Sequence, residues 1–305
     1  MASSVYLDMD PGHDDALALL VALALMPVRG LTTVAGNQTG DKTYLNARRI
    51  LFLANQLGLP VAPGYNKPLF RDLVTAAHVH GPSGLDGYQF PEIPSPNGTG
   101  HAMEFLENAL SHEQEPVVWI ATGPLTNVAA LLIGHPHLHQ KISQIAFMGG
   151  ALVGGNITPC AEFNTYVDPD AAAYVVGCGI PTTMVGLDVT HKALLAGKDL
   201  ERFRDLRPPI GEMLYRLFTF FANHEPNAGD MGMPIHDVLA IAAIANPTVF
   251  AWETIALHVE RCDEQRRGAT ETKIIGSGYP EIRVAVDIDV SRFFDWFWQS
   301  LAYYQ

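Results

Sequence analysis

The chain has 305 residues, of which 48% are hydrophobic and 17% are charged, so it can bury a sizeable core and is not disordered. Its 19 Lys and Arg against 32 Asp and Glu give a formal net charge of −13, which argues against nucleic acid or an anionic membrane surface as a partner. The longest uncharged apolar run, residues 16–28, is too short to span a bilayer comfortably. Because the three cysteines are scattered and no secretory signal is evident, we expect reduced thiols and a cytoplasmic protein.

Strand-like and helix-like segments alternate along most of the chain. Strands are predicted at 5–8, 30–36, 60–62, 116–121, 145–149, 182–186, 254–258 and 281–287. Helices are predicted from 16, at 41–58, 102–111, from 125, at 169–176, 209–222, 236–245 and from 291. This alternation is typical of α/β proteins. We therefore predict one domain over 1–305, built on a single open, mostly parallel, doubly wound sheet with helices on both faces.

Two segments interrupt the alternation. Residues 63–101 are rich in Gly, Pro and His, and residues 223–235 read NHEPNAGDMGMPI. We interpret both as loops. Long connections in compact domains are often functional lids, and the sequence leaves open whether the loops at 76–101 and 223–235 close over a ligand.

The turn after the first strand is unusually acidic. Asp8, Asp10, Asp14 and Asp15 fall within eight positions, between a buried strand and an apolar helix. A single Asp at a helix start can serve only to cap it. Four crowded carboxylates repel one another, and a hard divalent cation with oxygen ligands relieves that repulsion most directly.

Other polar residues follow further predicted strands. In an open α/β sheet, ligands bind outside the carboxyl ends of the strands, so these side chains are expected to converge there. Taken singly each has a structural alternative: a turn former, a helix cap, a solvated loop or a surface histidine. The residues are Asn37, His80, Thr122, Asn156, Glu162, Asn164, His224, His236 and Asp237.

The segments that carry these residues resemble the inosine-uridine preferring nucleoside hydrolase family. The ordered set covers nearly the whole chain and is far more specific than a lone DxD. It comprises LDMDPGHDDALALL (7–20), VAGNQT (34–39), HGPSGLDG (80–87), ATGPLTNVA (121–129), MGGALVGGN (148–156), AEFNTYVDPDAA (161–172), GLDVTHKA (186–193) and IHDVLAIA (235–242).

The resemblance implies hydrolysis of the bond between ribose and base with a bound Ca²⁺. By match to the family motifs, Asp10, Asp15 and Asp237 supply carboxylate ligands and Thr122 its backbone carbonyl. Oxygen-only ligation suits Ca²⁺ better than zinc. Asp10 is the expected general base, acting on a water whose pKa the metal lowers. Asp8 is expected to support the ligands rather than bind the metal.

The resemblance also assigns the substrate contacts. The ribose hydroxyls would be held by Asp14, Asn156, Glu162, Asn164 and Asp237, and Asn37 is a further expected substrate-binding residue. His80, His224 and His236 would lie near the nucleobase, with His236 the expected general acid and the other two as alternatives.

The sequences of the motifs are similar to those of the pyrimidine-preferring members, which implies uridine and cytidine as substrates. The 223–235 loop departs from that subgroup, so a broad or purine-preferring enzyme stays open. No tryptophan falls in the expected pocket loops, and stacking of a purine on indole is therefore unsupported. The resemblance suggests a homodimer or homotetramer.

Two other functional classes compete with this interpretation. A strand ending in DMD also resembles the aspartyl-phosphate phosphatases, but the chain shows no basic phosphate cradle. A non-catalytic nucleoside- or calcium-binding protein is the second, although every expected chemical residue is present.

Overall fold

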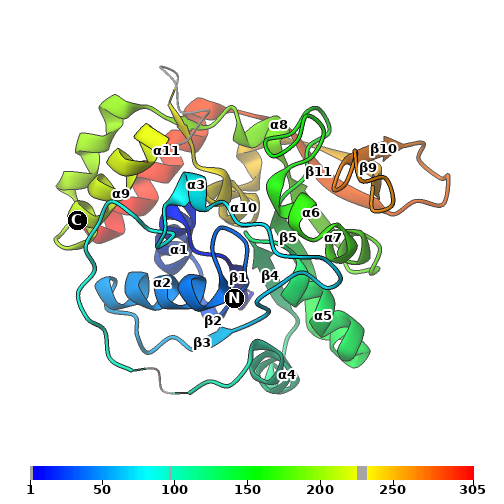
Figure 1. Ribbon diagram of the computed structural model, residues 1–305, viewed down its shortest axis with the longest axis horizontal. Coiled ribbons are helices and arrows are strands. Elements are labelled where there is room, and N and C mark those ends of the chain that lie inside the picture. The colour runs from blue at the N-terminus through cyan, green and yellow to red at the C-terminus, as the bar shows by residue number, and fades with distance from the viewer. Residues whose placement is uncertain (1–2, 96–97, 225–231) are drawn as a thin grey trace.

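The computed structural model describes residues 3–95, 98–224 and 232–305. Its centre is a nine-stranded sheet in the order β10-β9-β11-β6-β5-β4-β1-β2-β3 (Figure 1). The strands are β1 (Val5–Met9), β2 (Val28–Thr33), β3 (Val61–Pro63), β4 (Val117–Ala121), β5 (Ile142–Met148), β6 (Thr182–Val185), β9 (Phe250–Val259), β10 (Thr270–Lys273) and β11 (Glu281–Ile288). A two-stranded pair joins β7 (Leu194–Leu195) to β8 (Met233–Pro234).

The sheet is parallel from β3 across to β11, and β9 runs in the opposite direction, so that its pairings with β11 and with β10 are both antiparallel. This confirms the predicted open, mostly parallel α/β sheet. Strand β10 was not predicted because its sequence, TETK, is too polar to read as a buried strand. It pairs with β9 at the edge of the sheet, in the hairpin region that projects on one side of the molecule in Figure 1.

Helices cover both faces of the sheet, as predicted. They are α1 (His13–Leu25), α2 (Gly40–Leu53), α3 (Ala77–His80), α4 (Ala102–His112), α5 (Thr126–Gly134), α6 (Phe163–Val167), α7 (Pro169–Val176), α8 (Leu187–Thr190), α9 (Ile210–His224), α10 (His236–Ala245) and α11 (Val290–Leu301). Short 3-10 helices are η1 (Pro136–Lys141), η2 (Gly197–Asp205), η3 (Pro247–Val249) and η4 (Ala302–Tyr304).

The two faces bury separate hydrophobic clusters. Along β1, Leu7 and Met9 belong to the cluster under α1, α9, α10 and α11, whereas Tyr6 belongs to the cluster under α4, α5 and α7. This division follows from the alternation of side chains along a strand. Helix α1 packs against α9, α10 and α11, which explains why its sequence is apolar on all sides.

Strand order places the acidic turn at the point where the connections diverge. The chain runs from β1 outward to β2 and β3, then returns to β4 on the other side of β1. Asp8 of β1 pairs with Ala121 of β4, so the turns that follow the two strands leave the sheet side by side. Such a switch point is where open α/β sheets bind ligands.

The described parts of the two predicted loops contain little regular structure. Within 63–101 the described residues include the single-turn helix α3. Most of the loop predicted at 223–235 lies outside the described residues, which resume at Gly232. None of the helices in the described ranges combines the length and apolar character needed to span a bilayer.

Candidate active site

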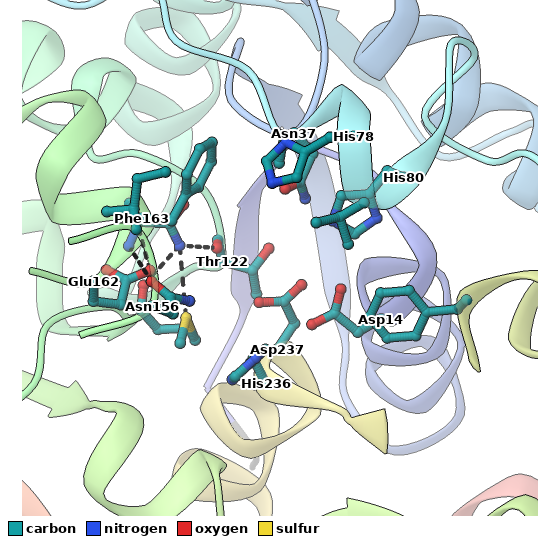
Figure 2. Close-up of a pocket in the computed structure, with 16 residues that line it drawn as sticks. Asp14, Asn37, His78, His80, Thr122, Asn156, Glu162, Phe163, His236 and Asp237 are labelled. Carbon is teal, nitrogen blue, oxygen red and sulfur yellow. Dashed lines mark hydrogen bonds between the residues drawn. The ribbon is translucent and has the colours of Figure 1, made fainter. Parts of the chain in front are cut away.

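A pocket opens at the carboxyl ends of β1, β4 and β5 and gathers most of the predicted site residues. Figure 2 shows Asp14 and Asp237 pointing toward its centre, between Glu162 and Asn156 on one side and Asn37 and His80 on the other. Nine of the predicted residues line it: Asp14, Asn37, His80, Thr122, Asn156, Glu162, Asn164, His236 and Asp237.

Asp15 is fixed at the start of α1. One carboxylate oxygen accepts hydrogen bonds from the main-chain N–H of Gly12 at 2.9 Å and from Asn37 Nδ2 at 3.1 Å. The other accepts from Thr122 Oγ1 at 2.7 Å. The carboxylate therefore caps α1 and also ties it to the turns after β2 and β4.

Asp10 is held by one oxygen and leaves the other without a partner. Its Oδ2 accepts from the main-chain N–H of Asn37 at 2.6 Å. Its Oδ1 is buried and has no hydrogen-bond partner among the described residues. A buried carboxylate oxygen of this kind is costly unless a ligand occupies it, which fits a cation.

Two glycines make room for this carboxylate. A Cβ at Gly36 would overlap Asp10 Oδ2, and a Cβ at Gly123 would lie 2.6 Å from Asp10 Oδ1. Any larger residue at either position would displace the Asp10 side chain, so both close approaches require glycine.

A cluster of buried acids surrounds Asp10. Oxygens of Asp14, Asp15 and Asp237 all lie within 4.8 Å of one another. Burial, followed by the charges of the neighbouring aspartates, raises the pKa of Asp237 well above its usual range. Burial and Asp15 raise the pKa of Asp10 in the same way. Carboxylates this close bind either a proton or a cation, and an all-oxygen donor set fits a hard divalent cation.

Thr122 joins the two walls of the pocket. Its hydroxyl donates to Asp15, and its carbonyl oxygen accepts from Asn164 Nδ2 at 2.7 Å. The alternative of a helix cap is wrong, because α5 begins only at Thr126 and its N-cap residue is Leu125. The second lone pair of the Thr122 carbonyl remains able to bind a cation.

Glu162 and Asn164 form a buried wall rather than a solvated loop. The Glu162 carboxylate caps α6, accepting from the main-chain N–H groups of Asn164 at 2.7 Å, Thr165 at 3.1 Å and Gly150 at 2.9 Å. Burial raises its pKa to about 6, although these hydrogen bonds oppose the shift. Asn156 continues the wall and accepts from the main-chain N–H of Phe163 at 2.9 Å.

His80 rests on a second buried histidine, His13, which was not among the predicted site residues. His13 Nε2 lies 2.9 Å from the carbonyl oxygen of Asp86, and its Nδ1 lies 3.0 Å from His80 Nδ1. Burial lowers the pKa of His13 to about 4, so the ring is neutral near pH 7 and carries its proton on Nε2, toward the carbonyl. The main-chain N–H of His13 also donates to His80 Nδ1 at 3.3 Å, so both the ring and the main chain of His13 contact this nitrogen.

His236 begins α10 and lines the pocket. Its Nδ1 lies 2.7 Å from Thr190 Oγ1, and burial lowers its pKa to about 3. The ring is therefore neutral near pH 7, and its Nε2 carries the proton when the Thr190 hydroxyl donates to Nδ1.

His224 lies at the end of α9, outside the described lining of the pocket. It is exposed, and its Nδ1 lies 2.8 Å from the carbonyl oxygen of Phe220. Because residues 225–231 lie outside the described ranges, its expected contact with the base stays a prediction.

Several pocket residues gave no signal in the sequence. Phe221 sits in the continuous apolar pattern of α9, and Phe163 lies between two polar residues that drew attention instead. No tryptophan is among the described lining residues. The residues missed are Ala76, His78, Val79, Met148, Ile157, Phe163 and Phe221.

Asp8 lies beside the site without lining the pocket. Its Oδ1 accepts from Thr32 Oγ1 and from Asn127 Nδ2 at 2.7 Å, and burial raises its pKa to about 7. It thus links β1 to β2 and α5, behind the turn that carries Asp10.

This combination of a parallel α/β sheet and a buried carboxylate pocket at its switch point agrees with the comparison to known proteins. The chain belongs to the inosine-uridine preferring nucleoside hydrolase family, whose model matches residues 5–295. It is therefore an N-glycosyl hydrolase that acts on nucleosides, and the phosphatase and non-catalytic alternatives are wrong.

Particular relatives refine this class. The chain is 44% identical over 310 residues to the pyrimidine-specific ribonucleoside hydrolase RihA of Salmonella typhimurium, covering the whole of both chains. Its fold is similar to that of a plant nucleoside hydrolase, with a TM-score of 0.91, 31% identity and 99% of each chain covered. A purine-preferring ribonucleoside hydrolase from Gardnerella vaginalis also gives a TM-score of 0.91 and 31% identity over 98% of each chain.

Proposed function

We propose that this enzyme hydrolyses the N-glycosidic bond of pyrimidine ribonucleosides, with Ca²⁺ bound, to give ribose and the free base. The observation that carries the site assignment is the buried, unpartnered Oδ1 of Asp10 beside the Asp14, Asp15 and Asp237 cluster. The pyrimidine preference is supported by the 44% identity to enzymes of that specificity over the full length.

Asp10, Asp15, Asp237 and the carbonyl of Thr122 would hold the cation. The donor set is all oxygen, and no cysteine or histidine belongs to the cluster among the described residues, which favours Ca²⁺ over zinc. When bound, Ca²⁺ would lower the pKa of the attacking water and fix the ribose hydroxyls.

Asp10 is the proposed general base. Its Oδ2 is anchored by the main-chain N–H of Asn37, so the carboxylate has one defined orientation. From there it removes a proton from the attacking water. Cleavage of the C–N bond develops positive charge on the sugar, and the surrounding carboxylates stabilise that charge.

The ribose would be held between the two walls of the pocket. Asp14 and Asn37 offer polar groups from one wall, and Asn156, Glu162 and Asn164 from the other. Several of these side chains are already fixed by hydrogen bonds within the protein, so they hold the sugar near its reactive geometry at little further entropic cost.

The leaving base needs a proton or a hydrogen bond, and His236 is the proposed donor. Thr190 can set the required tautomer by donating to His236 Nδ1. His80, which also lines the pocket, is the second candidate. His224 is retained as a base-contacting residue on the strength of the family motif alone.

We also propose a homo-oligomer, a dimer or tetramer. Exposed apolar side chains in the connection between β10 and β11 support it, since Ile274 is 81% and Ile275 60% exposed and such patches commonly lie in protein interfaces. Light scattering of the wild type and of an Ile274→Asp, Ile275→Asp variant tests this assembly, and a monomeric wild type would contradict it.

A turnover panel tests the proposed function. We expect ribose release from uridine and cytidine to exceed release from inosine and adenosine, and we expect 2′-deoxyuridine to lose at least about 10²-fold because buried polar partners are left unpaired. Asp10→Asn should lower kcat by about 10²–10⁴-fold, and a chelator should abolish turnover until Ca²⁺ is restored. Faster purine turnover would overturn the base preference, and undiminished activity in chelator would overturn the metal requirement.

A further inference from the structure

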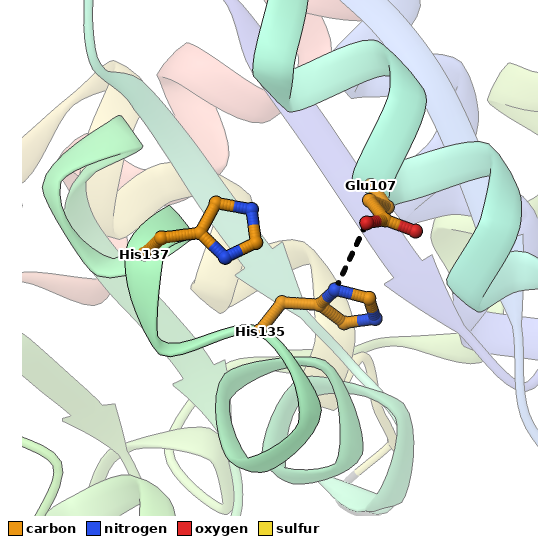
Figure 3. Close-up of side chains that lie close together, drawn as sticks. All are labelled: Glu107, His135 and His137. Atoms are coloured by element: carbon orange, nitrogen blue, oxygen red, sulfur yellow. Dashed lines mark ion pairs between the residues drawn. The ribbon is translucent and has the colours of Figure 1, made fainter.

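A second group of potential metal ligands lies away from the pocket. Glu107 projects from α4, His135 directly follows α5, and His137 belongs to η1 (Figure 3). Helix α5 starts at the carboxyl edge of the sheet after β4 and runs back, while η1 leads directly into β5. The group therefore lies at the amino edge of the strands, opposite the active site.

The spacing of the three side chains suits a single cation. One ligand atom from each lies within 4.8 Å of the others, and His135 Nδ1 is 3.3 Å from Glu107 Oε1. A tetrahedral zinc with bonds of about 2.0–2.1 Å places its ligand atoms roughly 3.3–3.4 Å apart. The His135–Glu107 pair already has this separation, and the exposed His137 needs only a small side-chain movement to join it.

Main-chain hydrogen bonds hold the backbone that carries the two histidines. The main-chain N–H of His135 donates to Leu131 at 2.8 Å, and its carbonyl accepts from Leu138 at 2.9 Å. Pro136 fixes the backbone between the two histidines. The neighbouring His139 is directed elsewhere, with Nε2 3.2 Å from the carbonyl oxygen of Leu132, so it does not belong to the group.

The donor types separate this group from the catalytic cluster. Two imidazoles with one carboxylate favour Zn²⁺, Co²⁺ or Ni²⁺, whereas the aspartate cluster favours Ca²⁺. The side chains of His135 and Glu107 are 24% and 49% exposed, so a cation can reach them from solvent and the fourth position stays open to water.

We propose that Glu107, His135 and His137 form a surface binding site for one divalent transition-metal cation, typified by Zn²⁺. The site is distinct from the catalytic carboxylates and does not depend on the reaction assigned to them. Because imidazole must be neutral to bind a metal, occupancy should fall in acid.

Cobalt provides the direct test, because a Co²⁺ ion bound by histidines in tetrahedral geometry absorbs visible light much more strongly than one bound by oxygens in octahedral geometry. The enzyme is saturated with Ca²⁺ and titrated with Co²⁺, and Zn²⁺ is then added to displace it. We expect the wild type to bind one equivalent of Co²⁺ that shows the strong visible absorption of the tetrahedral ion. The His135→Ala, His137→Ala variant should bind Zn²⁺ about 100-fold more weakly. Removing a residue that only hydrogen-bonds a metal ligand can already lower metal affinity by about 100-fold, and this variant removes two ligands.

The matched control is His258→Ala. His258 Nε2 lies 3.7 Å from Glu260 Oε2, so this pair resembles the His135–Glu107 pair, but it is not part of any three-residue group found among the described residues. We expect this variant to bind Co²⁺ like the wild type. Absence of the strong spectrum in the wild type, or equal Zn²⁺ affinity in the double variant, would overturn the proposal. Unchanged uridine turnover with Ca²⁺ checks that each variant is folded.

Discussion

At the scale of single residues, the site depends on close approaches that only particular side chains permit. Asp10 is confined between Gly36 and Gly123 and is anchored by the main chain of Asn37. The orientation of the neutral His236 ring is likewise fixed by one contact, between its Nδ1 and the Thr190 hydroxyl. Substitutions that leave the chemical groups in place but alter these contacts should therefore impair the enzyme.

Gly36→Ala should displace Asp10 without removing it. The new Cβ would overlap Asp10 Oδ2, so the carboxylate must move, and a misplacement of about 1 Å can cost about 10²-fold in rate. Steady-state kinetics with uridine and calorimetric Ca²⁺ titration measure the effect. Gly58→Ala is the control, because a Cβ added there would have no described atom within 4 Å. Equal activity of the two variants would show that Asp10 tolerates displacement.

His236→Ala should slow uridine hydrolysis strongly, by about 10²–10⁴-fold, while sparing a riboside with an activated leaving group such as p-nitrophenol. Thr190→Val should produce a smaller loss of the same kind, because valine cannot donate to His236 Nδ1 and the donor tautomer is no longer favoured. Comparing kcat for both substrates measures the two effects. Equal losses with both substrates would refute the acid role.

At the scale of elements, helix starts supply much of the site. Helix α1 places Asp15 in its first turn, α6 begins with the capping carboxylate of Glu162, and α10 begins with His236 and Asp237. Each helix start presents N–H groups that favour negative charge. For Asp15 and Glu162, main-chain hydrogen bonds at these helix starts oppose the rise in pKa that burial causes, and the titration of such groups is linked to stability.

Glu162→Gln should change how stability depends on pH. Since burial raises the pKa of Glu162 from 4.5 to about 6, the folded state binds the proton more tightly than the unfolded state. The wild type is therefore stabilised as pH falls from above 6 to below 4.5, by about 2 kcal/mol for this group. Urea unfolding of the metal-free proteins measures the free energy of unfolding at each pH. As the pH falls from above 6 to below 4.5, the free energy of unfolding of the variant should rise by about 2 kcal/mol less than that of the wild type. Parallel pH profiles for the two proteins would contradict this account.

At the scale of the whole molecule, the sheet order assembles one site from distant parts of the chain. Asp15 and Thr122 are 107 positions apart, yet they share a hydrogen bond because β1 and β4 are neighbours. The α10 helix that carries Asp237 packs against α1, which closes the cluster. A cation held there would contact the turns after β1 and β4 and the start of α10, and it should therefore stabilise the folded state.

Calcium should therefore raise the melting temperature. At a concentration 100-fold above Kd, binding to the folded state alone contributes about 2.7 kcal/mol, which corresponds to roughly 4 °C for a chain of 305 residues. Calorimetry with Ca²⁺ and with chelator measures the shift. Mg²⁺ at equal concentration should give a smaller one, and Asp10→Asn should reduce the response to Ca²⁺. No Ca²⁺-dependent shift in the wild type would argue against a site built from these aspartates.

The sequence by itself was sufficient for the features that depend on local pattern. The period of apolar residues predicted the alternating strands and helices, and four aspartates beside one turn predicted a cation-binding loop. These inferences needed no knowledge of distant contacts, because strand and helix periodicity and turn composition are properties of neighbouring residues. The motifs around Asp10, Glu162 and His236 then indicated the family.

Only the tertiary structure decided which of these residues act together. Thr122 proved to bond Asp15 instead of capping a helix, and Glu162 proved buried instead of solvated. The polar strand β10 and the group of Glu107, His135 and His137 gave no local signal at all. In each case the outcome depends on which elements pack side by side, and that is settled by burial and pairing across the whole fold rather than by any short stretch of sequence.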